Sequence, residues 1–172
     1  LAFAIMSVGL AQAQAPKRVA LLIGNGNYKE VSILPNPKRD VALIGDVLKN
    51  AGFDIVTINT DLDRASMVKA IRAFEDQLNN VDIGVIYYAG HGIEVNGQNF
   101  LIPTDAKLAS DKDIEDEAVS LDRLIKSLDS AARLRLIILD ACRDNPFVPK
   151  MTRSTGAWTS APAHIGQGSL VT

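Results

Sequence analysis

The single cysteine of this chain and one of its two histidines each stand directly after an apolar run. Cys142 lies in "RLIILDACRDNPF" (residues 135–147), and His91 lies in "VIYYAGHG" (residues 85–92). An imidazole beside a thiol takes up its proton, and the resulting thiolate attacks carbonyl carbon atoms. A lone cysteine is more often a small buried hydrophobic residue than a catalytic one. The predicted position of Cys142 in the fold therefore distinguishes between these two roles.

Apolar runs that alternate with amphipathic segments predict an α/β fold. Strands that are apolar throughout are typical of a parallel sheet covered on both faces, so we expect a three-layer αβα sandwich with a mainly parallel sheet. We expect a Gly-His-Gly turn at 90–92, a hairpin around Asn96-Gly97, and then an acidic loop. The expected strands are 18–24, 53–58, 82–88 and 134–139, and the expected helices are 37–51, 63–78 and 121–130.

This topology brings the two candidate residues to one edge of the sheet. They are 142 − 91 = 51 positions apart, and a crossover helix between them returns the chain parallel to the strand it left. Because the carboxyl ends of parallel strands line the crevice of such sheets, we expect neighbouring strands to hold His91 as base and Cys142 as nucleophile. The N–H groups of Gly92 and Cys142 are candidate donors to an oxyanion. This chemistry needs no metal, and His164 has no comparable support.

Length and charge bound the kind of protein. A chain of 172 residues predicts one domain with a core of its own. Lys and Arg number 18 against 20 Asp and Glu, which gives a formal net charge of −2. Nucleic-acid-binding domains carry a basic excess on one face, so this composition excludes nucleic acid as a partner.

The first fifteen residues, "LAFAIMSVGLAQAQA", differ in composition from the rest. An apolar run followed by Ala-x-Ala sites predicts the remnant of a secretory signal peptide, and we expect cleavage after Ala13. The alternative is a short membrane anchor, although the run is shorter than the roughly 20 residues that a span needs. We therefore expect a secreted or periplasmic protein without membrane contact beyond this signal. Its one cysteine cannot form an internal disulfide and stays a free thiol.

The two motifs together resemble the caspase-like cysteine peptidases, in particular the bacterial metacaspase-like branch. "VIYYAGHG" followed by "LIILDACRDNPF" carries the resemblance, which covers about residues 17–149. Caspases have the histidine about 50 residues before the cysteine. The resemblance implies a caspase-like fold and an endopeptidase that acts on polypeptide substrates.

The departures from the caspase pattern bear on specificity. Asp140 stands where caspases have glutamine, and Asp144 stands where they have glycine. In metacaspases an aspartate at the first of these positions and another in the first helix, here Asp40, form an acidic pocket. The resemblance therefore implies cleavage after Arg or Lys, because a carboxylate pair rejects an acidic side chain. In the alternative interpretation, Asp40 is a first-turn acid favoured by the helix dipole and Asp140 is a turn residue.

Some metacaspases bind calcium, and the acidic stretch 115–117 resembles part of that site. The longer acidic insertion of those relatives after Gly-His-Gly is missing here. We therefore expect no cofactor and leave calcium open. The plain interpretation of the stretch is a solvated loop that leads into a helix.

The expected organisation has three parts: a signal remnant at 1–15, a catalytic domain at 16–148, and a linker at 149–172. The resemblance implies that the linker leads to a small-subunit segment of the same protein, which completes the fold and the substrate pocket. Lys150 and Arg153 then offer sites for activating self-cleavage. Two other functions stay open, namely a catalytically silent caspase-like binding module and a His/Cys peptidase or amidase of another clan.

Overall fold

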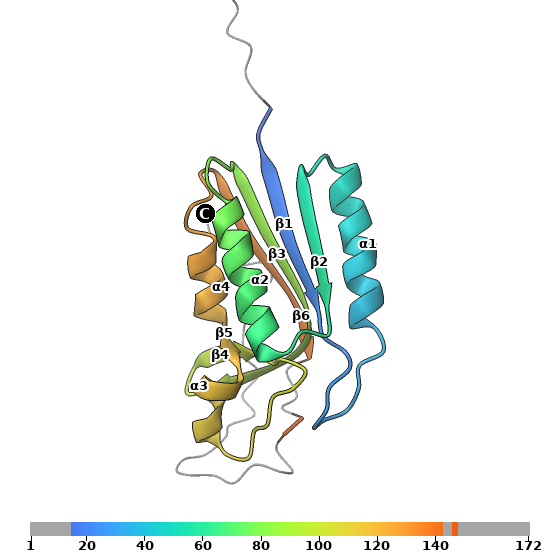
Figure 1. Ribbon diagram of the computed structural model, residues 1–172, viewed down its shortest axis with the longest axis vertical. Helices are drawn as coiled ribbons and strands as arrows, with labels where there is room; N and C mark the ends of the chain where they lie inside the picture. The colour runs from blue at the N-terminus through green and yellow to red at the C-terminus, as the bar shows by residue number, and fades with distance from the viewer. Residues whose placement is uncertain (1–14, 143–145, 148–172) are drawn as a thin grey trace, which may run out of the picture.

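The computed structural model describes residues 15–142 and 146–147, with the backbone alone for Cys142. Strands and helices alternate along most of this chain (Figure 1). The strands are β1 (Arg18–Gly24), β2 (Ile55–Thr60), β3 (Ile83–Val95), β4 (Gln98–Leu101), β5 (Val119–Ser120) and β6 (Leu134–Cys142). The helices are α1 (Pro37–Asn50), α2 (Arg64–Gln77), α3 (Ile114–Glu117) and α4 (Leu121–Ser127), with a 3₁₀ turn at Asp111–Asp113.

Four of the strands form a parallel sheet in the order β2-β1-β3-β6. The far end of β3 leaves this sheet and pairs antiparallel with β4, which in turn pairs with β5. The predicted mainly parallel α/β sheet is therefore confirmed. Since consecutive parallel strands need crossovers, the helices α1, α2 and α4 lie between them in the chain.

Helices cover both faces of the sheet, as the apolar strands predicted. On one face, Val19, Leu21 and Ile23 of β1 pack in a buried cluster with side chains of α2 and α4. On the other face, Ala20 and Leu22 pack with the apolar side of α1. Figure 1 shows α2 and α4 together in front of the sheet and α1 apart from them. Each buried aliphatic side chain contributes about 1.5–3 kcal/mol, so both layers hold the strands in register.

The predicted helix boundaries also have their expected causes. Pro37 begins α1, and Gly52, with a φ of 81°, follows its end. Asp63 caps α2 by accepting a hydrogen bond of 2.7 Å from the Ser66 N–H, and this bond lowers the pKa of the Asp63 carboxyl. These caps satisfy backbone groups that a helix end leaves without partners.

The Gly-His-Gly motif is not a turn, and this sequence expectation was wrong. β3 continues through it, because its backbone pairs first with β6 and then, from Gly92 onward, with β4. The chain reverses only at Asn96 and Gly97, where the φ angles are 52° and 77°. Positive φ at both positions is typical of a two-residue hairpin turn, so the predicted hairpin is confirmed. The predicted acidic loop contains the short elements from the 3₁₀ turn to β5.

The predicted parts at the two ends of the chain lie almost wholly outside the described residues. Of the signal remnant at 1–15 only Ala15 is described, and the linker at 149–172 is not. Within the described residues, no helix combines the length and the apolar composition needed to cross a bilayer.

A buried asparagine ties together three loops at the carboxyl edge of the sheet. Asn25, directly after β1, is 0% exposed. Its Oδ1 accepts a 2.9 Å hydrogen bond from the Leu62 N–H after β2, and its Nδ2 donates to the Ile102 carbonyl after β4 at 3.2 Å. These bonds supply partners that the buried loop backbone otherwise lacks.

We predict that Asn25→Ala destabilises the protein by about 1–3 kcal/mol, because it leaves buried backbone groups unsatisfied. Urea unfolding of the full-length protein measures the change. The matched control is Asn79→Ala, which removes one exposed bond to the Asp76 carbonyl and is expected to cost less than about 0.5 kcal/mol. Equal unfolding midpoints for the two variants would contradict the prediction.

Candidate functional site

The site is built on the neighbouring strands β3 and β6. Their parallel register runs from Ile83 opposite Leu134 to His91 opposite Cys142, the last pair of the ladder. The backbones of the two predicted functional residues therefore lie side by side at the carboxyl edge. The neighbouring strands that the sequence predicted are present, although Cys142 ends β6 and does not follow it in a loop.

The imidazole of His91 is buried, with 5% of the residue exposed. Its Nε2 lies 3.1 Å from the carbonyl oxygen of Ser32, in the loop between β1 and α1. A carbonyl oxygen only accepts, so Nε2 carries the proton and the neutral ring keeps a lone pair on Nδ1. Nδ1 is itself buried and meets no hydrogen-bond partner among the described residues. The imidazole thus offers a buried basic nitrogen that the side chains and backbone of the described residues do not occupy.

Burial also sets the protonation state of this ring. Desolvation lowers the pKa of His91 below its ordinary value of 6.5, and the bond to the Ser32 carbonyl offsets part of this effect. A buried imidazole resists the charged form because its charge loses hydration. His91 is therefore neutral at pH 7, which is the form that a general base needs.

One of the two predicted specificity acids contacts the hydroxyl of Tyr87, and the other acts on it through charge. Tyr87 donates a 3.1 Å hydrogen bond to Oδ2 of Asp140, which is exposed in β6. Burial, this bond and the negative charges of Asp140 and Asp40 together raise the pKa of Tyr87. Asp40 stands in the first turn of α1 with its side chain 24% exposed. Asp140 of β6 thus binds the phenol directly, whereas Asp40 of α1 affects it only through its charge.

Asp40 has a weak partner of its own. Its Oδ1 lies 3.8 Å from Nε of Arg39, whose side chain is 70% exposed. Exposed pairs of this kind contribute about 0–1 kcal/mol. Another cation can therefore replace Arg39 at little cost.

Gly92 lies next to His91 in β3, and a side chain there would be crowded. A Cβ on Gly92 would stand 3.2 Å from the Cβ of Ala141 in β6. Glycine therefore lets the two strands approach where the ladder ends. The oxyanion role of the Gly92 and Cys142 amides stays a prediction.

The acidic stretch that resembles a calcium site is spread out. Glu117 accepts a 3.0 Å hydrogen bond from the Lys107 N–H, while Glu115 and Asp116 are exposed. Among the residues that the structure describes, no group of three or more His, Cys, Asp or Glu side chains gathers into a metal site. Calcium binding stays an open question of the sequence.

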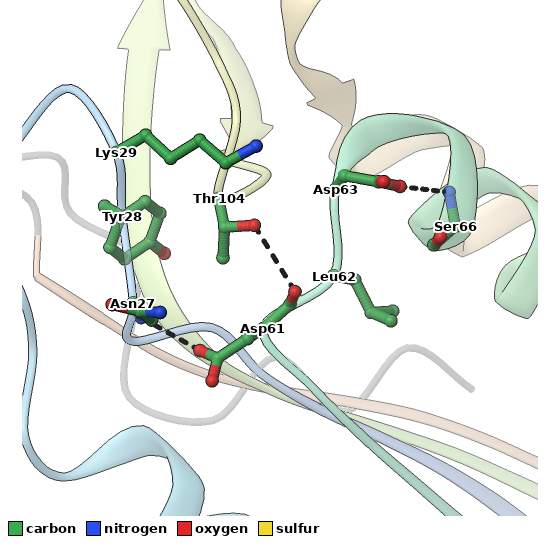
Figure 2. A pocket seen from close by; sticks show the side chains of 8 residues that line it. All are labelled: Asn27, Tyr28, Lys29, Asp61, Leu62, Asp63, Ser66 and Thr104. Carbon is green, nitrogen blue, oxygen red and sulfur yellow. Dashed lines mark hydrogen bonds between the residues drawn. The ribbon is translucent and has the colours of Figure 1, made fainter.

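A polar cavity of about 530 Å³ opens at the same edge of the sheet (Figure 2). Tyr28 lines it and also contacts His91, with ring centroids 4.5 Å apart. The Asp61 carboxylate at its wall accepts hydrogen bonds from the N–H groups of Gly26 and Asn27, each at 2.9 Å. Tyr28 thus contacts both the cavity and the imidazole, and the cavity lining contains no residue predicted for catalysis or specificity.

Sequence reasoning missed Ser32 and Tyr28. Ser32 contributes a backbone carbonyl, which every residue type possesses, so no sequence pattern reveals it. Tyr28 stands in the turn-rich "GNGNY", where an aromatic residue beside a strand end was the available signal.

Several known proteins are similar to this chain in sequence. Residues 17–167 match the Caspase domain family. The human and mouse mucosa-associated lymphoid tissue lymphoma translocation proteins 1 are 33% and 32% identical over 133 residues, 77% of this chain and 16% of theirs. The Paracaspase of Dictyostelium discoideum is 28% identical over 155 residues, which are 85% of this chain and 36% of that protein.

The chain therefore spans a minor part of the length of these relatives. The family match, in contrast, covers most of the chain and includes β1 to β6 with their helices. With its parallel sheet between two helix layers and its histidine and cysteine on paired strands, the chain belongs to the caspase domain family of cysteine peptidases.

Proposed function

We propose that this chain is the catalytic domain of a cysteine endopeptidase in which His91 and Cys142 form the dyad. The observation that carries the proposal is the register that pairs their backbones, together with the Nδ1 of His91, which has no hydrogen-bond partner among the described residues. A neutral imidazole with a free lone pair beside a thiol-bearing strand end is the arrangement that activates a nucleophile. We also propose that the domain belongs to the bacterial metacaspase-like branch of the family.

The reaction follows the capacities of these groups. Nδ1 of His91 takes the proton of the Cys142 thiol, and the thiolate sulfur bonds to the carbonyl carbon of the substrate. The amides of Gly92 and Cys142 bind the oxyanion. The imidazolium then gives its proton to the leaving amine as the C–N bond breaks. Water, deprotonated by His91, hydrolyses the thioester and restores the thiol.

We infer a preference for Arg or Lys before the cleaved bond. Asp140 accepts a hydrogen bond from the Tyr87 hydroxyl, and the negative charge of Asp40 also acts on this phenol, which supports a joint role of the two acids. A guanidinium or ammonium placed there gains charge-assisted hydrogen bonds, whereas an acidic side chain meets like charges. The weak Arg39 contact of Asp40 does not compete strongly with such a ligand.

We also infer export of the protein, with residues 1–15 as a signal remnant and residues 149–172 as a linker to a small-subunit segment. The apolar run with its Ala-x-Ala sites supports the first inference. An N-terminal sequence of the exported protein that starts at Gln14 would support it. A mature form that retains the run would overturn it.

Full-length protein is expected to hydrolyse peptides with Arg or Lys before the cleaved bond and to leave matched Asp peptides intact. Cys142→Ala removes the nucleophile and is expected to lower kcat by at least about a thousandfold. Release of a fluorescent leaving group measures both. If no peptide turns over, with or without calcium, while a partner protein is bound, the silent binding module is the better description.

Asp140→Asn is expected to lower kcat/KM for the Arg peptide by roughly 10- to 100-fold, because one charge-assisted hydrogen bond contributes about 1.5–3 kcal/mol. Asp129→Asn is the matched control. Asp129 pairs with Arg135 at 3.1 Å, near the start of β6 and away from the site. Equal losses in the two variants would remove the acidic pocket from the proposal.

The pH dependence of kcat/KM tests the role of His91. Burial lowers the pKa of His91, so the ring stays neutral as the pH falls to and below 6.5. A base that must be neutral loses activity only when it is protonated, and the acid limb of kcat/KM is therefore expected below pH 6.5. An acid limb above that value would contradict the assignment of His91 as the base.

A further inference from the structure

We propose that Tyr28 and Tyr88 are positioning residues that hold the backbone of His91 in a closed ring of hydrogen bonds. Their hydroxyls form a hydroxyl ring with the N–H and the carbonyl of His91. The inference rests on the proposed function, because it assigns the ring the task of fixing the base. Tyr28 comes from the loop after β1, and Tyr88 precedes the Gly-His-Gly motif in β3.

Three contacts make up the hydroxyl ring. The His91 N–H donates to Oη of Tyr28 at 2.7 Å, and the Tyr88 hydroxyl donates to the His91 carbonyl at 2.7 Å. The two tyrosine oxygens lie 3.4 Å apart. The Tyr88 hydroxyl also lies 3.1 Å from the Ile102 carbonyl. Tyr88 is 0% exposed and Tyr28 is 5% exposed, so both hydroxyl contacts lie within the protein.

Proton counting fixes the direction of every bond in the ring. A tyrosine hydroxyl has one proton to donate and lone pairs to accept with. The Tyr88 proton points to carbonyl oxygens, which only accept, so a hydrogen bond across the 3.4 Å contact between the hydroxyls is donated by Tyr28. The chain of donors then runs from the His91 N–H through Tyr28 and Tyr88 to the His91 carbonyl. Each bond polarises the next, and the circuit starts and ends on one residue.

Tyr88 is suited to this task because it keeps its proton. Its side chain is fully buried, and burial raises its pKa well above the ordinary value, with the neighbouring Tyr28 adding to the effect. A phenolate would have no proton for the His91 carbonyl. Tyr88 therefore keeps the proton that it donates to the His91 carbonyl at neutral pH.

Gly90 is explained by the same ring. A Cβ added at Gly90 would lie 2.6 Å from Oη of Tyr28 and 2.7 Å from Oη of Tyr88. Carbon atoms do not approach hydroxyl oxygens so closely, so any side chain here would push the two hydroxyls away from His91. The first glycine of the motif thus leaves room for the oxygens that hold the histidine.

The hydroxyl ring restrains the backbone of His91, and the loop after β1 also restrains the imidazole. This loop holds His91 at its backbone through the Tyr28 hydroxyl, at its ring face through the Tyr28 ring, and at Nε2 through the Ser32 carbonyl. Loss of the Tyr28 hydroxyl leaves the aromatic contact but frees the backbone of the base. A base displaced by about 1 Å loses roughly a hundredfold in rate.

The experiment compares Tyr28→Phe, Tyr88→Phe and the double variant in full-length protein. Each single variant is expected to lower kcat for the Arg peptide by roughly 10- to 100-fold while KM changes less than about twofold. The double variant is expected to resemble the single ones, because a ring that is already open cannot be opened again. The matched control is Ser127→Ala, which removes a buried hydroxyl bonded to the Leu124 carbonyl at 2.7 Å in α4. This control is expected to lose stability without losing kcat.

A second readout does not depend on catalysis. Nitrogen NMR of the imidazole, assigned by the loss of its signal in His91→Asn, reports the tautomer and the pKa of His91. The unsubstituted protein is expected to have the proton on Nε2 and a pKa below 6.5. Either Phe variant is expected to move the pKa of His91 up towards 6.5. A less tightly held imidazole admits water, and this hydration stabilises its charged form.

The outcomes separate the two proposals. If the unsubstituted protein hydrolyses no peptide, the proposed function fails, and the titration of His91 still tests the ring. If kcat and the His91 titration are unchanged in both Phe variants, the positioning role is overturned. Losses that add in the double variant would overturn the closed ring and leave two independent contacts.

Discussion

The parallel register between β3 and β6 is the constraint on which the site depends. It aligns nine pairs of residues, and the last pair is His91 with Cys142. In a strand the side chains alternate between faces, so a slip of one residue would carry a side chain to the opposite face of the sheet. Both strands are fixed against such a slip by apolar side chains that pack beneath α2 and α4. The core therefore sets the alignment of His91 with Cys142.

The loop after β1 complements that register. It begins at Asn25, which binds the loops after β2 and β4, and it continues through Tyr28 to Ser32, which contact the histidine. A loop with this many bonds to its neighbours behaves as part of the scaffold. Its contacts restrain a buried imidazole whose Nδ1 has no partner among the described residues.

Much of the fold could be predicted from the sequence because its signals are local. The apolar run of β1, the proline at the start of α1, the Asp63 cap and the Asn96-Gly97 turn each act within a few residues. The sequence of Gly-His-Gly favours a turn, because two closely spaced glycines are common in turns. Here the glycines allow close approach, to the tyrosine hydroxyls at Gly90 and to Ala141 at Gly92. Contacts between distant segments of the chain decide this, and no local pattern contains them.

In the candidate site, too, some residues could be predicted from the sequence and others could not. His91, Cys142, Asp40 and Asp140 stood out by residue type and by position at strand or helix ends, and the fold brings their segments to one edge. Ser32 acts through its backbone, and Tyr28 and Tyr88 act through geometry that requires three segments to meet. Residue type predicts which atoms can react. It does not predict which atoms hold them in place.

The two strands of the site differ in their neighbours. β3 runs between β1 and β6 and then pairs with β4, whereas β6 pairs with β3 alone among the described residues. Ile138, in the middle of β6, is 40% exposed. The imidazole thus belongs to an interior strand with restraints on both sides, and the sulfur belongs to a border strand with restraints on one. A segment that added to the sheet at this border would contact the strand of Cys142 and not the strand of His91.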